Sequence, residues 1–226
     1  MGLNLTVTVN TDSRYTFTGQ FLEASAIFTR RAREIERNHD YSRPIPDEVR
    51  CEHRAYVSTT VMQCAAAMET EAHEICVHGP GSYLGTDRTD KCAHETLLPI
   101  AEQVDKLPTL ERFDLIMQTL GKNTLERGRN PYQSAQLLVR LRNKLVHYKS
   151  SWGAEMSEEK LFKALECLRL KAPPFTSSSM NFFPHRCLSS DCAAWALTTT
   201  VSFLDDVYER LGVPSRFATY RQKLVP

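Results

Sequence analysis

The feature that most constrains the fold is an uninterrupted segment from Asp47 to His78, which contains no proline and no glycine. The breaker sequence at 43–46 (RPIP) precedes it, Asp47 is well placed as an N-cap, and Gly79-Pro80-Gly81 ends it. This pattern predicts one helix of about thirty residues, roughly 45 Å long. The middle of the segment is rich in small residues, which favours close packing against another helix.

The remaining periodicity is also mostly helical, with start and stop signals that separate the segments. Asn130 is predicted to cap a helix that Pro131 begins, and Asp191 is predicted to cap the last helix, which Gly212 closes. The expected helices, besides 47–78, cover about 21–40, 94–106, 108–121, 131–149, 158–170 and 191–212. We therefore predict an all-α helical bundle at 17–212, with a short extended arm at 1–16, a polar loop at 79–93, a long loop at 171–190 and a C-terminal tail at 213–226.

Composition excludes several classes of protein. With 42% hydrophobic and 24% charged residues, the chain has enough apolar surface to fold and is not intrinsically disordered. A formal net charge of +1 argues against coating nucleic acid by bulk electrostatics. No apolar run reaches the ~18 residues of a membrane span, and no secretory signal is evident, so no membrane partner is expected. Seven scattered cysteines indicate a reducing, cytoplasmic setting rather than a disulfide framework.

The segment 141–148 (LRNKLVHY) is the most informative motif. In a helix, Asn143 and His147 project about 40° apart and share a face, whereas Arg142 and His147 project about 140° apart. One helix would then present Arg, Asn and His around a small apolar strip formed by Val139 and Val146. If that strip packs against a symmetry mate, two copies of the triad line one cleft.

The Arg142-Asn143-x3-His147 pattern resembles the R-x4-H signature of the HEPN superfamily (higher eukaryotes and prokaryotes nucleotide-binding domains). The long small-residue helix and the closing segment 192–212 also look like helices of stand-alone HEPN proteins, so the resemblance spans roughly 17–212 in architecture. It implies a dimeric, metal-independent endoribonuclease with composite sites and no cofactor. It also implies RNA as substrate, 2′,3′-cyclic phosphate and 5′-OH products, and a toxin or defence role with an antitoxin or regulatory partner.

The chemistry of RNA cleavage suits these side chains. His147 can act as general base or acid, and Arg142 can hold the scissile phosphate and neutralise its developing charge. Asn143 supports them by hydrogen bonding, and Tyr148 is placed to stack on a base. Glu69, late in the long helix, is predicted to orient Arg142; the alternative is a surface carboxylate.

Two other hypotheses remain open. The first is a catalytically silent HEPN-like module that uses the same helix for dimerisation, RNA binding or partner binding. The second is a tetrahedral zinc site built from two Cys-x-His pairs, Cys76 with His78 and Cys92 with His94, although this is not the common zinc-ribbon spacing. We find no phosphate-loop, dinucleotide-binding or serine-hydrolase motif.

Overall fold

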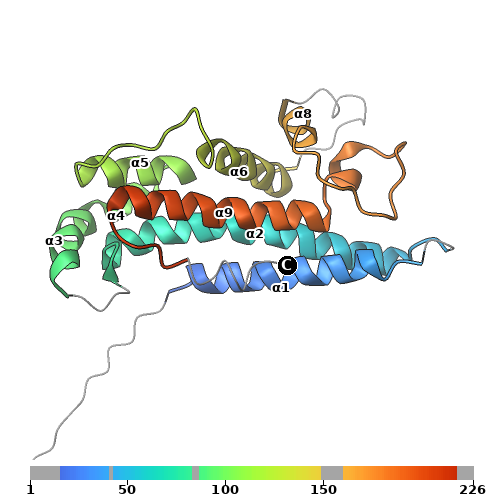
Figure 1. The fold of residues 1–226 in the computed structure, drawn as a ribbon, viewed down its shortest axis with the longest axis horizontal. Helices are drawn as coiled ribbons and strands as arrows, with labels where there is room; N and C mark the ends of the chain where they lie inside the picture. The colour runs from blue at the N-terminus through green and yellow to red at the C-terminus, as the bar shows by residue number, and fades with distance from the viewer. Residues whose placement is uncertain (1–15, 41–42, 83–86, 149–159, 218–226) are drawn as a thin grey trace, which may run out of the picture.

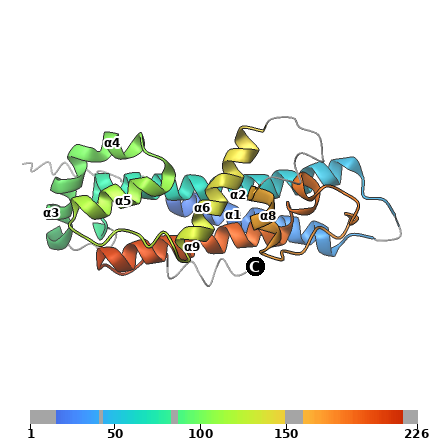
Figure 2. The ribbon, with the colours of Figure 1, turned by 90° about the horizontal axis from the view of Figure 1, so that it is seen from above.

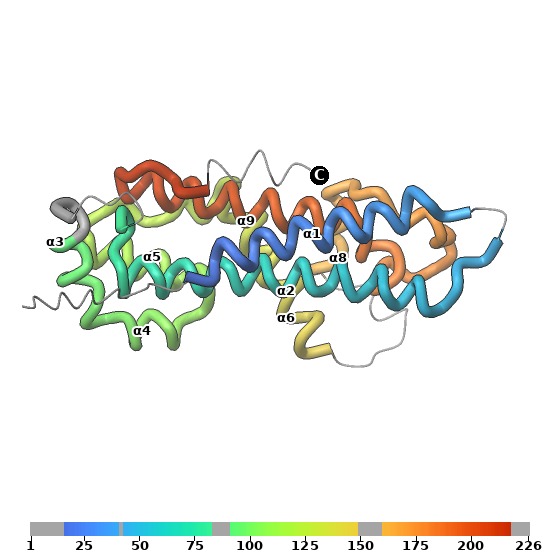
Figure 3. The backbone as a smooth tube through the Cα atoms, turned by 90° about the horizontal axis from the view of Figure 1, so that it is seen from below, coloured from blue at the N-terminus to red at the C-terminus, as the bar shows by residue number. Residues whose placement is uncertain are grey.

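The computed structural model describes residues 16–40, 43–82, 87–148 and 160–217. All regular elements in these ranges are helical, which confirms the predicted all-α class. Three long helices lie side by side and form the body of an elongated bundle (Figures 1 and 3), namely α1 (Thr18–Arg37), α2 (Asp47–His78) and α9 (Ser190–Leu211). The predicted extended arm lies almost wholly outside the described residues.

Helix α2 is the centre of the bundle and has the predicted bounds. It contacts α1 and α9 and also the shorter helices, so it is buried on more than one side. One side of its small-residue middle is completely buried, as expected for close helix packing, at Val61, Cys64, Ala65, Ala67 and Met68. Pro46, not Asp47, occupies the N-cap position, and Gly79 ends the helix with a φ of 82°.

Shorter helices cover the rest of α2 and α9. Figure 1 shows α5 (Thr109–Thr119) and α6 (Tyr132–Val146) along the side of α2 and α9 that is opposite α1. At one end of the bundle lie α3 (Asp87–Leu97), the 3-10 turn η2 (Leu98–Ile100) and α4 (Ala101–Asp105). Towards the other end lie α8 (Lys160–Glu166) and η3 (Phe182–Arg186), as Figure 2 shows from above.

Several predicted boundaries were wrong. Helix α3 begins at Asp87, inside the segment 79–93 that we expected to be a loop. The helix expected at 94–106 is interrupted by η2, because Pro99 lies at the start of that 3-10 turn and cannot continue the α-helical hydrogen bonds. Helix α8 ends at Glu166, well before 170, and Arg169 then adopts a positive φ of 53°.

Helix α6 is shorter than predicted at both ends. It begins at Tyr132, and the Asn130 side chain accepts a hydrogen bond from Ser134 Oγ (2.8 Å) instead of capping the helix backbone. It ends at Val146, because His147 leaves the helical conformation with φ −110° and ψ 40°. His147 and Tyr148, the last residues of the motif, therefore lie at the C-terminal end of α6.

The connector at 171–190 is more ordered than a simple loop. The segment Phe182–Arg186 is a kinked turn closed by a hydrogen bond from the Cys187 N–H to the Phe182 carbonyl oxygen (2.8 Å), and the buried Phe183 ring stacks on Phe162 with centroids 4.9 Å apart. Ser189, not Asp191, caps α9, since its side chain accepts a hydrogen bond from the Cys192 N–H (3.2 Å). Asp191 instead accepts the backbone N–H of Lys171 (3.2 Å) and anchors the start of the connector.

Residues 213–217 belong to the packed bundle, although we predicted a tail from 213. Gly212 ends α9 with a φ of 80°, as expected. Beyond it, the Phe217 side chain is buried against Tyr208, and Arg216 forms ion pairs with Glu71 and Glu74 of α2. None of the described helices combines the length and apolar character needed to cross a membrane.

Candidate functional site

The motif lies on the C-terminal half of α6, and the amphipathic pattern of this helix decides which side chains are accessible. Tyr132, Ala135, Leu138 and Leu141 face the core. The opposite side is an exposed polar stripe at helical spacing, formed by Gln133, Gln136, Arg140, Asn143 and His147. Asn143 and His147 therefore share an exposed face, as predicted.

Arg142 points away from that stripe, towards α2. Its Nη2 donates to Glu69 Oε1 and lies 3.4 Å from Thr109 Oγ1 at the start of α5. The Thr109 hydroxyl in turn donates to Glu69 Oε1 (2.6 Å). The Arg142 and Glu69 side chains are 22% and 30% exposed, so the ion pair is partly shielded from water. The predicted contact of Glu69 with Arg142 is thus present.

His147 stands apart from this ion pair. It is exposed at the C-cap of α6, and its backbone N–H donates to the carbonyl oxygen of Asn143 (2.9 Å). No hydrogen bond or ion pair joins His147 to Arg142 within the described residues. A single chain therefore presents the two side chains in different directions, in line with their angular separation of about 140° on the helix.

Tyr148 continues this exposed end of α6. Its side chain is 46% exposed, and its ring lies 5.9 Å from that of Phe183 in η3. Lys144 Nζ lies over the Tyr148 ring, 6.0 Å from its centroid. Val146 is also half exposed. The end of α6 thus offers an aromatic surface with one cationic group, Lys144, beside it, and such a surface is suited to stacking on a base.

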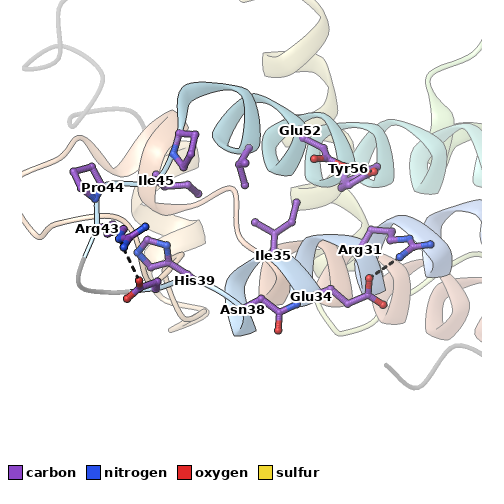
Figure 4. A pocket seen from close by; sticks show the side chains of 13 residues that line it. Arg31, Glu34, Ile35, Asn38, His39, Arg43, Pro44, Ile45, Glu52 and Tyr56 are labelled. Carbon is purple, nitrogen blue, oxygen red and sulfur yellow. Dashed lines mark hydrogen bonds and ion pairs between the residues drawn. The ribbon is translucent and has the colours of Figure 1, made fainter.

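A large cavity lies elsewhere, at the turn between α1 and α2. It has a volume of about 660 Å³, and Figure 4 shows Ile35 and Tyr56 among its lining side chains. Arg31 of α1 pairs here with Glu34 at 2.8 Å. None of the site residues predicted from the sequence lines this cavity.

The zinc hypothesis gains no support. The described residues contain no group of three or more His, Cys, Asp and Glu side chains that could hold a metal ion. Cys76 is buried, and burial raises the pKa of its thiol to about 12, whereas Cys92 is exposed. Cys76, His78, Cys92 and His94 therefore do not form a metal site. All seven cysteines are free, as expected for a chain without a disulfide framework.

A buried polar cluster at the α1–α2–α9 junction was missed by sequence reasoning. His53 Nε2 contacts Glu36 Oε1 (2.8 Å), and Ser190 donates to the same carboxylate through its backbone N–H (2.7 Å) and its hydroxyl. Burial acts to raise the pKa of Glu36, but these hydrogen bonds outweigh it and hold that pKa below its ordinary value. The three residues lie far apart in the chain, so no local pattern could have indicated the cluster.

The comparisons leave the family open. The chain was compared with protein-family models, with curated proteins and with solved structures, and none of the three comparisons finds a match.

Proposed function

We propose that the protein is a metal-independent endoribonuclease of the HEPN type. The observation that carries this proposal is the display of the motif: α6 ends in an exposed His147, Asn143 lies one turn earlier, and Arg142 is held by Glu69. The proposed role as a toxin or defence effector, with an antitoxin or regulatory partner, depends on the same hypothesis.

The reaction needs one proton removed and one supplied. His147 takes the proton from the ribose 2′-OH, the 2′-oxygen bonds to phosphorus, and the bond from phosphorus to the 5′-oxygen breaks. A second acid gives a proton to the leaving 5′-oxygen. Arg142 binds the phosphate oxygens, where charge accumulates in the transition state, and Asn143 donates a hydrogen bond to the phosphate or to His147. The products are a 2′,3′-cyclic phosphate and a 5′-OH.

The geometry favours a site shared by two copies of the chain. Because Arg142 and His147 point in different directions on one helix, a second α6 brings a matching set of groups to the same phosphate. The second copy also supplies the second proton-transferring histidine. Val146 is 51% exposed and lies beside His147, so it provides apolar surface for such an interface.

A silent module is the second candidate, and one observation favours it. Nη2 of Arg142 is bound to Glu69, and only 22% of the Arg142 side chain is exposed. A guanidinium held in this way stabilises the contact between α2 and α6 even if no phosphate ever binds. In this alternative, α6 serves for dimerisation, RNA binding or partner binding.

Cleavage of a mixed RNA pool in the presence of EDTA distinguishes the two candidates. We expect wild type to cleave and to leave 2′,3′-cyclic phosphate ends, and His147→Ala to lose at least about a hundredfold in rate. His73→Ala is the matched control, because His73 is an exposed histidine on α2 that pairs with Asp105 (3.0 Å). This control variant should cleave like wild type.

The other outcomes are equally informative. Cleavage by wild type and His147→Ala at the same rate would show a contaminant or a different site, and would overturn the role of His147. Absence of cleavage by all three proteins, with folded dimers in solution, would favour the silent module.

A further inference from the structure

A small pocket lies where the connector 173–188 covers the N-terminal half of α2. Its volume is about 10 Å³, room for roughly one oxygen-sized atom. The described residues that line it are Arg50, His53, Arg54, Pro173, Phe175, Thr176, Met180, His185 and Leu188. None of these is acidic, which sets this pocket apart from the larger cavity at the α1–α2 turn.

The two charged side chains that line the pocket, Arg50 and Arg54, are both positive. Arg54 Nη2 lies 2.7 Å from His185 Nδ1, and because a guanidinium only donates, Nδ1 accepts and Nε2 of His185 carries the proton. The pKa of His185 is lowered by burial and by the positive charges of Arg54 and Arg50. Two carboxylates touch lining residues from outside: Glu36 binds His53, and the exposed Asp47 lies 2.9 Å from Arg50.

Two nitrogen atoms of lining residues are buried without a partner. His53 is 1% exposed, its Nε2 is bound to Glu36, and its Nδ1 has no hydrogen bond. Nε of Arg50 is likewise buried and without a hydrogen-bond partner. An unsatisfied buried polar atom is destabilising and uncommon in folded proteins, so two such atoms on residues that line one pocket favour a polar group bound there.

We propose that this pocket binds a phosphate group. One oxygen enters the pocket, and the others stay at its mouth, where the guanidinium groups of Arg50 and Arg54 and the Nε2–H of His185 can donate to an oxyanion. Singly protonated inorganic phosphate or a phosphomonoester also has an O–H that can donate to Nδ1 of a neutral His53 ring, whereas a phosphodiester of RNA has no such proton. The site does not depend on ribonuclease activity.

The phosphate group has two possible sources, a free phosphomonoester or the backbone of RNA. Two observations point to different sources. The unpartnered acceptor Nδ1 of His53 favours a phosphomonoester, which can donate an O–H to it. The backbone source, which rests on the proposed function, is favoured by position along the chain, because Phe183, whose ring contacts Tyr148 at the end of α6, is two residues before His185.

Binding of inorganic phosphate, measured by thermal unfolding at constant ionic strength, tests the proposal. We expect a saturable rise in Tm for wild type that sodium chloride does not reproduce. Arg54→Gln and Arg50→Gln should each weaken phosphate binding about tenfold, since each removes a charged donor. The matched control is Arg129→Gln, which alters an exposed ion pair with Glu126 and should bind like wild type. If Arg54→Gln does not fold by circular dichroism, Arg50→Gln carries the test, because its side chain is 35% exposed.

Equal Tm shifts from chloride and phosphate, or equal binding by wild type and both pocket variants, would overturn the proposal. Two competitors identify the source. Uridine monophosphate and an all-2′-deoxy oligonucleotide, which cannot be cleaved, are each tested for displacement of inorganic phosphate from the protein. Competition by the monophosphate alone identifies a phosphomonoester site. Stronger competition by the oligonucleotide, lost in Arg54→Gln, identifies a backbone site even if the wild-type protein cleaves no RNA.

Discussion

Helix α2 carries two ion-pair sites that differ sharply in burial. Glu71 and Glu74 both bind Arg216, and the exposed fractions of the two glutamates are 0% and 8%. Glu69, two residues before Glu71, binds Arg142 at a site where 30% and 22% of the two side chains are exposed. The first site is part of the core, and the second opens towards solvent beside the motif.

One helix thus carries a buried ion-pair site that stabilises the fold and an open ion-pair site beside the candidate functional motif. The buried site ties together distant parts of the chain: the Phe17 and Thr18 N–H groups donate to Glu74 (2.7 and 3.3 Å), and the Tyr208 hydroxyl donates to Glu71. Positions 69 and 71 project about 200° apart on a helix, so their carboxylates serve opposite sides of α2. We therefore expect loss of the buried site to act on stability and loss of the open site to act on α6.

The largest loss in the free energy of unfolding is expected for Arg216→Met. The substitution keeps an apolar side chain of similar length but leaves two buried carboxylates without their cation, and breaking a buried ion pair typically destabilises by about 3–5 kcal/mol. Urea unfolding should show this loss in the free energy of unfolding. Arg129→Met, at an exposed ion pair with Glu126, is the control and should change stability by no more than about 0.5 kcal/mol. A similar small loss in Arg216→Met would mean that the buried site is not a structural support.

A smaller, pH-dependent loss in the free energy of unfolding is expected for Glu36→Gln. Because hydrogen bonds from His53 and Ser190 hold the pKa of Glu36 below its ordinary value of 4.5, the charged carboxylate stabilises the fold above about pH 4.5. This contribution disappears as the pH falls through the lowered pKa. Wild type should exceed Glu36→Gln by about 1–3 kcal/mol at pH 7, and the gap should narrow towards pH 3. A gap that is constant between pH 7 and pH 3 would contradict this role of the charge.

The sequence predicted best what depends on local signals. The bounds of α2 follow from breakers at 43–46 and 79–81, and these are direct steric effects. These bounds need no knowledge of the rest of the fold. The contact of Glu69 with Arg142 joins residues 73 apart, and from the sequence it was one of two alternatives, the other being a surface carboxylate.

What the sequence did not predict depends on tertiary packing. Arg216 lies beyond the last helix signal, and its role appears only once α9 has brought it beside Glu71. Ser189, Ser190 and Asp191 are all good N-cap residues, and the course of the connector decides that Ser189 is used. His53 likewise carries no local signal of its buried contact with Glu36.

At the open site on α2, Glu69→Gln should lower the free energy of unfolding by about 1 kcal/mol, because a partly exposed hydrogen bond and ion pair contribute less to stability than buried ones. Thr109→Val removes the hydroxyl that donates to the same carboxylate, and the two substitutions should be coupled in a double-mutant cycle. If Arg142 acts on phosphate, Glu69→Gln should also lower RNA cleavage. A loss as large as that of Arg216→Met would erase the distinction between the two sites.

The smallest effect on stability is expected for His147→Ala. The side chain is exposed at the end of α6, so its removal should change the free energy of unfolding at pH 7.5 by no more than about 0.5 kcal/mol. The same substitution is expected to abolish RNA cleavage, and this combination is what separates a catalytic group from a structural one. Urea unfolding and the cleavage assay on one protein preparation measure both quantities. A loss of stability comparable to that of Glu69→Gln would place His147 among the packing contacts of α6 and weaken the case for its role in proton transfer.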